Sequence, residues 1–361
     1  MKNSTQTRDL LIRHHRTYPL MQIQDLFKFL FQSAFGCEHL VSNRDAAIAY
    51  IRREYDSLPP MSPTPPDPLD GAYSRVHLSC LQEGLTPETL GELFCRSAKT
   101  EPSGQADLLD KLQTARDLIH EGLLPFSPEE FQDMLSVWAE KSYPPVHHSD
   151  AFRAAYHPAY RVIANEYLPF FPLLTHIDKL LRSGNPTVVV AIEGGSASGK
   201  TTLARLLSDL YGCTVFHMDD FFLRPEQRTP ERFSEVGGNV DRERFLEEVL
   251  LPLSQGKSVH YRRFDCSTQT LQPPVTVPPH RLTVVEGAYS MHPTLAPHYD
   301  LSVFLDISPA YQKSRILKRN SPPFAKRFFE EWIPLEQAYF TQTQIQDRCD
   351  LTLSIEEQNF L

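Results

Sequence analysis

The sequence predicts two domains: a mostly α-helical one over residues 1–185 and an α/β one with a mainly parallel sheet over residues 186–361. With 361 residues, the chain is too long for one ordinary hydrophobic core. Its apolar pattern also changes at the turn-forming cluster of residues 183–186. Helical spacing prevails before this cluster, and short β-branched runs alternate with helical stretches after it.

Helical patterns dominate the first half of the chain. Thr86-Pro87 and Ser127-Pro128 each place a capping residue before a proline, which favours a helix start. A proline-rich loop over residues 58–71 interrupts the helices. Apolar residues recur at helical spacing over 23–41, 45–55, 107–119, 128–140 and 150–165.

The second half alternates strands with helices, which predicts a parallel sheet. The run 187–192 is short and β-branched, as expected of a strand that is buried on both faces. The other predicted strands are 213–217, 282–285, 301–307 and 350–355. The predicted helices are 200–210, 241–251, 309–319 and 325–346, the last one broken at Pro334.

A phosphate-binding loop follows the first of these strands. The stretch 194–201 matches G-x-x-x-x-G-K-[ST] in full, and a helix follows it. Its glycines allow backbone N–H groups to approach phosphate oxygens, Lys200 would reach the β- and γ-phosphates, and Thr201 would hold Mg²⁺. We therefore expect ATP and Mg²⁺ as cofactors and a P-loop NTPase fold. The predicted nucleotide-binding residues are Gly194, Gly195, Ser196, Ala197, Ser198, Gly199, Lys200, Thr201 and Thr202.

Acidic residues at the ends of later strands predict phosphoryl transfer. Asp219 and Asp220 follow the strand at 213–217, and either carboxylate would take the proton of an acceptor hydroxyl, with Asp219 preferred. Glu286 ends the strand at 282–285, where an acidic residue can hold Mg²⁺ through water or orient the attacking group, and the alternative is an ordinary strand-end carboxylate. The carboxyl ends of parallel strands share one edge of the sheet, so we expect these groups beside the phosphate loop.

A basic helix would complete the catalytic set of Asp219 and Lys200. Arg315 and Arg319 lie one helical turn apart on the helix at 309–319, and share a face. Such a face can cover phosphates and stabilise the charge of the transition state. The alternative interpretation is a solvated basic helix face.

These segments resemble the uridine kinase and phosphoribulokinase family of P-loop kinases over about residues 187–357. MDDFF (218–222) is similar to the family segment with the catalytic base, which implies that role for Asp219. VVEGAY (284–289) and RILKRN (315–320) are similar to its acidic strand end and to the start of its lid helix. GGNVDRERF (237–245) implies that Asp241 contacts the hydroxyls of the acceptor.

The acceptor side departs from the uridine kinase pattern. The segment 263–269 holds Cys266 and Gln269 where uridine kinases have an aromatic residue and a histidine. Phe264, Asp265 and Gln269 are still candidate acceptor-binding residues, and the alternative is a surface hairpin. The resemblance implies an ATP-dependent kinase that phosphorylates a hydroxyl of a small metabolite, such as uridine or another nucleoside.

The composition of the chain disfavours several classes of binding partner. A net charge of −9 disfavours nucleic acid, and the chain has no apolar run of the roughly 18 residues that span a bilayer. The polar N-terminus lacks the apolar stretch of a secretory signal. The six cysteines are dispersed, which fits a reducing cytoplasm. The composition leaves open whether several copies of the chain assemble into a homo-oligomer.

The role of residues 1–185 also stays open. Three histidine-bearing segments, at 35–39, 75–77 and 146–150, would provide ligands for a metal or an anion, but their spacing matches no specific metal motif. Packed or surface histidines are the simpler interpretation. An alternative function is ATP sensing, in which the P-loop domain controls the helical domain. A separate activity of the helical half is a third hypothesis.

Overall fold

The computed structural model describes residues 2–356, and the chain divides into two compact units, Met1–Leu168 and Pro169–Leu361. The second unit thus begins ahead of the boundary at residue 185 that the sequence suggests. The difference is helix α8 (Phe171–Arg182), which packs on the sheet of the second unit. Along the described residues, no helix combines the length and the apolar character needed to cross a membrane.

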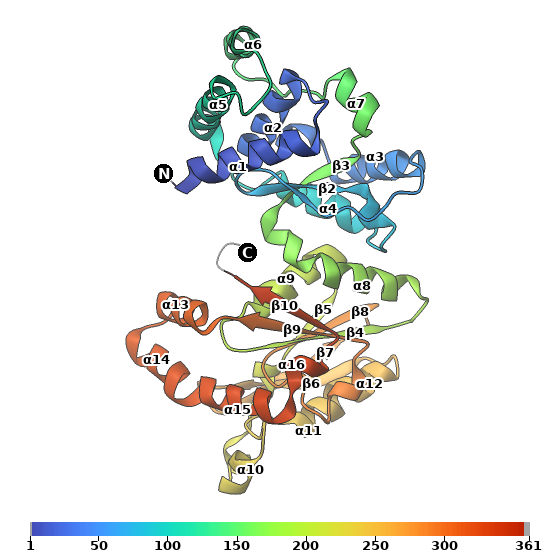
Figure 1. The fold of residues 1–361 in the computed structure, drawn as a ribbon. Coiled ribbons are helices and arrows are strands. Elements are labelled where there is room, and N and C mark those ends of the chain that lie inside the picture. Colours follow the sequence, from blue (N-terminus) through green and yellow to red (C-terminus); the bar gives the residue numbers. More distant parts are fainter. Residues whose placement is uncertain (1, 357–361) are drawn as a thin grey trace. The chain divides into compact units, whose positions relative to one another are not determined.

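The first unit packs helices around a small antiparallel sheet (Figure 1). Its strands are β1 (Asp67–Pro68), β2 (Tyr73–His77) and β3 (Tyr160–Ala164), in the order β1-β2-β3. Thr86 and Ser127 accept hydrogen bonds from backbone N–H groups as predicted N-caps. The helices are α1 (Lys2–Thr17), α2 (Ile23–Phe35), α3 (Arg44–Asp56), α4 (Pro87–Ser97), α5 (Gly104–His120), α6 (Pro128–Glu140) and α7 (Asp150–Tyr156).

Two helix predictions in this unit extend too far. The one over 23–41 ends at Phe35, because Gly36 adopts a left-handed φ of +62°. The predicted helix over 150–165 ends at Tyr156, because His157 adopts a left-handed conformation with φ +42° and a proline follows it. The chain then forms β3, which pairs with β2 in a register that joins Tyr73 to Ala164. Backbone pairing across the unit therefore overrides the local helical spacing.

Five parallel strands form the sheet of the second unit, in the order β10-β9-β4-β8-β5. Every residue of β4 is buried, as expected of a central strand that is covered on both faces. The α/β fold with a parallel sheet is thereby confirmed. The strands are β4 (Val188–Gly194), β5 (Thr214–His217), β8 (Leu282–Glu286), β9 (Leu301–Ile307) and β10 (Leu351–Ile355).

Helices cover both faces of this sheet (Figure 1). Helices α8 and α9 lie on one face, and α12, α15 and α16 lie on the other. Four predicted helices are confirmed, although short π-helical turns at Leu246–Leu250 and Phe328–Trp332 interrupt two of them. The break predicted at Pro334 is absent, because this proline lies in the first turn of α15, and the helix instead breaks at Gln344, which has φ +51°. The helices are α9 (Lys200–Tyr211), α10 (Pro230–Ser234), α11 (Arg242–Phe245), α12 (Leu251–Ser254), α13 (Pro309–Arg319), α14 (Pro322–Arg327), α15 (Ile333–Thr343) and α16 (Ile345–Arg348).

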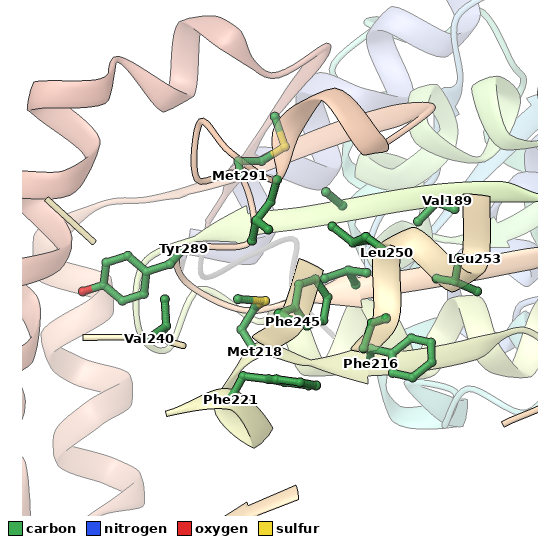
Figure 2. Packing of buried hydrophobic residues seen from close by; sticks show 14 of the residues in the cluster. Val189, Phe216, Met218, Phe221, Val240, Phe245, Leu250, Leu253, Tyr289 and Met291 are labelled. Atoms are coloured by element: carbon green, nitrogen blue, oxygen red, sulfur yellow. The ribbon is translucent and has the colours of Figure 1, made fainter. Parts of the chain in front are cut away.

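An apolar core lies beneath the face that α12 and α15 cover. Figure 2 shows Phe216, Phe245 and Leu250 of this core, together with Phe221. A separate antiparallel hairpin, β6 (Val259–Asp265) and β7 (Thr270–Val277), joins the core through Tyr261, which is 3% exposed. The hairpin is therefore fixed next to the residues that follow β5.

Candidate active site

The phosphate loop leaves the C-terminal end of β4. The neighbours of β4 are β8 on one side and β9 on the other, so the loop lies at the crevice where open α/β sheets bind ligands. Gly194 has φ +145°, and a Cβ there would lie 2.7 Å from the carbonyl oxygen of Leu305. Gly199, with φ +101°, turns the chain into α9. Both glycines of the motif are thus required by the backbone.

Lys200 is the first residue of α9, and its side chain folds back over the loop. The Nζ atom donates hydrogen bonds of 2.9 Å to the carbonyl oxygens of Gly194 and Gly195. The ammonium group therefore adds its charge to the N-terminal end of the helix, which already favours anions. This arrangement suits the phosphates of a nucleotide.

Thr201 and Glu286 meet at the neighbouring strand. The Thr201 hydroxyl donates a hydrogen bond of 3.1 Å to Glu286 Oε1, and Glu286 stands in register with Ile192 of β4. In the part of the chain that the structure describes, no group of three or more His, Cys, Asp or Glu side chains is arranged to hold a metal. Mg²⁺ commonly takes one or two protein oxygens, with waters and substrate phosphates as its other ligands. The hydroxyl and carboxylate therefore fit Mg²⁺.

His217 joins this pair, and sequence reasoning missed it. As the last residue of β5 it stands in register with Glu286, and its Nδ1 lies 2.6 Å from Glu286 Oε1. This hydrogen bond raises the pKa of His217. Only the pairing of β5 with β8 reveals the contact, because the two residues are far apart in the sequence.

Asp219 and Asp220 follow β5 in the short 3-10 turn Met218–Phe221. Asp219 as a whole is exposed, yet protein atoms crowd its carboxylate, and this desolvation raises its pKa. Lys200 opposes the shift and Glu286 adds to it, which places the carboxylate within electrostatic range of both. A carboxylate with a raised pKa is a better proton acceptor.

The β6–β7 hairpin adds cationic and aromatic groups beside these aspartates. The Tyr261 ring stacks on Phe221, with centroids 5.6 Å apart. Arg263 Nε lies 3.5 Å from Asp220 Oδ2, another contact that the sequence did not predict. Burial, and to a lesser extent the charge of Asp219, raises the pKa of the Cys266 thiol at the tip of the hairpin.

Two of the three acceptor-binding candidates on the hairpin, Asp265 and Gln269, form hydrogen bonds that stabilise the turn between β6 and β7. Asp265 Oδ1 accepts hydrogen bonds from the N–H and hydroxyl of Ser267, which lower its pKa to about 2. Gln269 has φ +59° and donates to a backbone carbonyl of the turn. Phe264 is buried beneath the guanidinium group of Arg228, at 5.7 Å from its ring centroid.

Asp241, the fourth acceptor-binding candidate, is 2% exposed and caps α11. Its Oδ1 accepts from the Arg244 N–H, and its Oδ2 accepts from Gln227 Nε2 at 2.9 Å. Its own N–H donates to the Phe221 carbonyl oxygen, which belongs to the turn that carries the two aspartates. Asp241 therefore fixes the backbone of this turn, and its contact with an acceptor stays a prediction.

Arg315 and Arg319 lie on α13, which begins two residues after β9 ends. The Arg315 guanidinium lies over the Tyr311 ring at 5.5 Å, and burial lowers its pKa. Arg319 is exposed one turn further along. Their part in phosphate binding stays a prediction.

In the first unit, one of the candidate histidines, His148, is packed among other side chains and is hydrogen-bonded by them. His148 Nδ1 lies 2.9 Å from Asp25 Oδ1, and its Nε2 lies 2.7 Å from the Tyr160 hydroxyl. The His148 ring also stacks on Phe152, with the two planes 5° apart. Hydrogen bonds and ring contacts thus explain His148 without a metal.

The geometry described so far defines a P-loop α/β unit of the kind that binds nucleoside triphosphates. Residues 189–322 match the model of the "Phosphoribulokinase / Uridine kinase family", so this stretch of the chain is a domain of that family. The resemblance that the motifs suggest is thereby confirmed for the second unit.

Two curated relatives carry the name phosphoribulokinase. The protein from Synechocystis is 29% identical over 126 residues, which cover 34% of this chain and 38% of the relative. The chloroplastic protein from Spinacia oleracea is 25% identical over 148 residues, which cover 35% and 37%. The matched region thus spans less than two fifths of either relative.

Among solved structures, a possible uridine kinase from Bacillus stearothermophilus is similar at 22% identity and a TM-score of 0.38. The similarity covers 50% of this chain and 99% of that one.

Proposed function

We propose that the protein is an ATP-dependent kinase that transfers the γ-phosphoryl group to a hydroxyl of a small metabolite. One observation carries the proposal: Lys200, the Thr201–Glu286 pair and Asp219 lie together at one edge of the sheet. Nucleotide binding alone requires the loop, whereas transfer also requires a base for the acceptor and positive charge near the moving group.

The donor nucleotide occupies the loop and the ends of β9 and β10. Lys200 holds the β- and γ-phosphates, and Thr201 and Glu286 hold Mg²⁺, which when bound neutralises phosphate charge. A cavity of about 680 Å³ at the ends of β9 and β10, lined in part by Tyr311 and Ser314, offers room for the base. Arg315 and Arg319 of the adjoining helix act on the phosphates.

Asp219 accepts the proton of the acceptor hydroxyl. The hydroxyl oxygen then forms a bond to the γ-phosphorus, and the bond from that phosphorus to the β–γ bridging oxygen breaks, which releases ADP. Lys200 stabilises the negative charge that develops on the phosphate oxygens. The raised pKa of Asp219 brings the carboxylate nearer to the proton affinity that this step needs.

A sugar phosphate is a better candidate acceptor than uridine. Two of the curated relatives are named phosphoribulokinase, and the segment at 263–269 holds Cys266 and Gln269 where uridine kinases have an aromatic residue and a histidine. Arg263 and Arg228 on the hairpin side of the site offer guanidinium groups that suit a phosphate. A nucleoside offers no such anion.

The test is ADP release with ATP and Mg²⁺ against a panel of sugar phosphates, free sugars and nucleosides. We expect acceptor-dependent turnover that falls roughly 10²–10⁴-fold in Asp219→Asn, whose amide cannot take a proton, while ATP still binds. Asp209→Asn, an exposed position on α9, is the matched control and should keep full turnover.

Full turnover in Asp219→Asn shows that another group is the base. Tight ATP binding without acceptor-dependent ADP release across the panel favours an ATP sensor over a kinase.

A further inference from the structure

Helix α15 contacts the first turn of the phosphate loop through one buried carboxylate. Glu336, which is 5% exposed, accepts two hydrogen bonds from Ser196. The Ser196 N–H donates to Oε2 at 2.9 Å, and the hydroxyl donates to Oε1 at 2.6 Å. The two residues are 140 positions apart in the chain, so no local pattern predicts this contact.

The peptide between Gly195 and Ser196 links this carboxylate to the loop lysine. Its N–H end donates to Glu336, and its C=O end accepts from Lys200 Nζ at 2.9 Å. Because a peptide unit is planar and rigid, the direction of the N–H bond determines the direction of the carbonyl bond. The Glu336 carboxylate therefore orients one of the two carbonyl groups that hold the Lys200 ammonium.

Helix α13 holds the following peptide. Gln312 Nε2 donates to the Ser196 carbonyl oxygen at 2.8 Å, so successive peptides of the loop are bound from two helices. The helices also approach closely: a Cβ on Gly195 would lie 3.0 Å from Gln312 Nε2 and 3.5 Å from Glu336 Oε2. A rotation of either peptide would break a partly buried hydrogen bond, which is costly.

We infer that Glu336 is a positioning residue that places the Lys200 ammonium for the phosphates of the nucleotide, through the Gly195–Ser196 peptide. The inference rests on the proposed function. A cation that is held in place before the nucleotide arrives needs no reorganisation on binding, and such preorganisation strengthens electrostatic stabilisation of phosphate charge.

The direct test is the dissociation constant of ATP·Mg²⁺ for Glu336→Gln. Glutamine keeps the size of the side chain but offers one acceptor oxygen and turns an NH₂ group toward the second Ser196 donor. We expect the dissociation constant to rise roughly tenfold, the size of one charge-assisted hydrogen bond. Glu330→Gln on the exposed face of the same helical region is the matched control and should bind as the wild type does.

A double-mutant cycle with Lys200→Ala separates positioning from a general loss of structure. If Glu336 acts through the lysine, then Glu336→Gln should change binding by less than roughly twofold once Lys200 is alanine. A penalty of equal size in both backgrounds, or wild-type binding by Glu336→Gln, overturns the inference.

Ser196→Ala keeps the test decisive should Glu336→Gln fail to fold. It removes the hydroxyl donor and keeps the N–H donor, so we expect roughly a threefold weaker binding that also vanishes in the Lys200→Ala background. ATP binding needs no acceptor. If no acceptor in the panel gives turnover, the proposed kinase activity is overturned, but the positioning role of Glu336 is not. If the wild-type protein binds no ATP, both proposals are overturned.

Discussion

At the scale of single residues, carboxylates next to the phosphate loop differ in what surrounds them. Glu193 directly precedes Gly194 and is fully buried, and burial raises its pKa to about 7. It accepts hydrogen bonds from the Gly194 and Met291 N–H groups and from the Tyr339 hydroxyl. Asp219, by contrast, is exposed as a whole residue, although desolvation of its carboxylate raises its pKa as well. Glu193 is therefore a structural group, although it directly precedes the loop in the sequence and Asp219 does not.

His148 in the first unit carries a testable pH dependence. Burial lowers its pKa to about 4, whereas an unfolded histidine takes up a proton near pH 6.5. Between these values the unfolded state binds more protons, so the free energy of unfolding falls as the pH falls from 6.5 to 4. The loss reaches at most about 1.4 kcal/mol per pH unit. We expect His148→Gln to flatten this dependence in thermal unfolding between pH 7 and 4.5.

The control for this prediction is His120→Gln, an exposed position at the end of α5, which should leave the slope unchanged. Equal slopes in His148→Gln and the wild type would show that His148 does not remain neutral in the folded unit.

At the scale of elements, strand pairing decides which predicted residues meet. The parallel register of β5 with β8 sets His217 beside Glu286, and the pairing of β8 with β4 brings Glu286 to the loop. The strands themselves were predictable from β-branched runs. Their order was not, because a strand's apolar pattern is the same whichever neighbour it has.

The hairpin β6–β7 leads to a prediction about the acceptor. Arg263 faces Asp220, whereas Arg262 donates to backbone carbonyls of its own hairpin. Under the proposed function, Arg263→Leu should raise KM for an anionic acceptor roughly tenfold or more and leave ATP binding unchanged, because a guanidinium–phosphate contact is lost. Arg262→Leu on the same strand is the matched control. The measurement is KM for the acceptor from steady-state kinetics at saturating ATP. An unchanged KM in Arg263→Leu would show that Arg263 of the hairpin does not bind the acceptor.

At the scale of the whole molecule, α8 determines at which residue a fragment of the second unit must begin in order to fold. Leu173, Leu174 and Ile177 are fully buried, and Asp178 accepts a hydrogen bond from Tyr211 of α9. Burial of such side chains contributes about 1.5–3 kcal/mol each, which together approaches the whole stability of a typical domain. We expect residues 169–361 to fold alone and bind ATP, and residues 186–361 to unfold at much lower temperature or to aggregate.

Thermal unfolding and ATP binding of the two fragments test this prediction. Equal unfolding midpoints would show that α8 is dispensable and that residue 185 serves as well as a boundary.

The sequence by itself determined the phosphate loop, the order of strands and helices in the second half, and the family that they resemble. These features are local: the loop is one contiguous motif, and each strand or helix is encoded by the spacing of neighbouring residues. For the same reason the helix predicted over 150–165 failed, since β3 forms only because β2 is there to pair with it.

Only the tertiary structure decided which side chains support the loop and the acidic residues. Glu336 reaches Ser196, His217 reaches Glu286 and Arg263 reaches Asp220 across 140, 69 and 43 positions of sequence, respectively. Such contacts depend on how helices and strands pack, and packing follows from the shape and burial of the whole unit. A local pattern carries no record of them, because each of these residues would be an ordinary surface group in another fold.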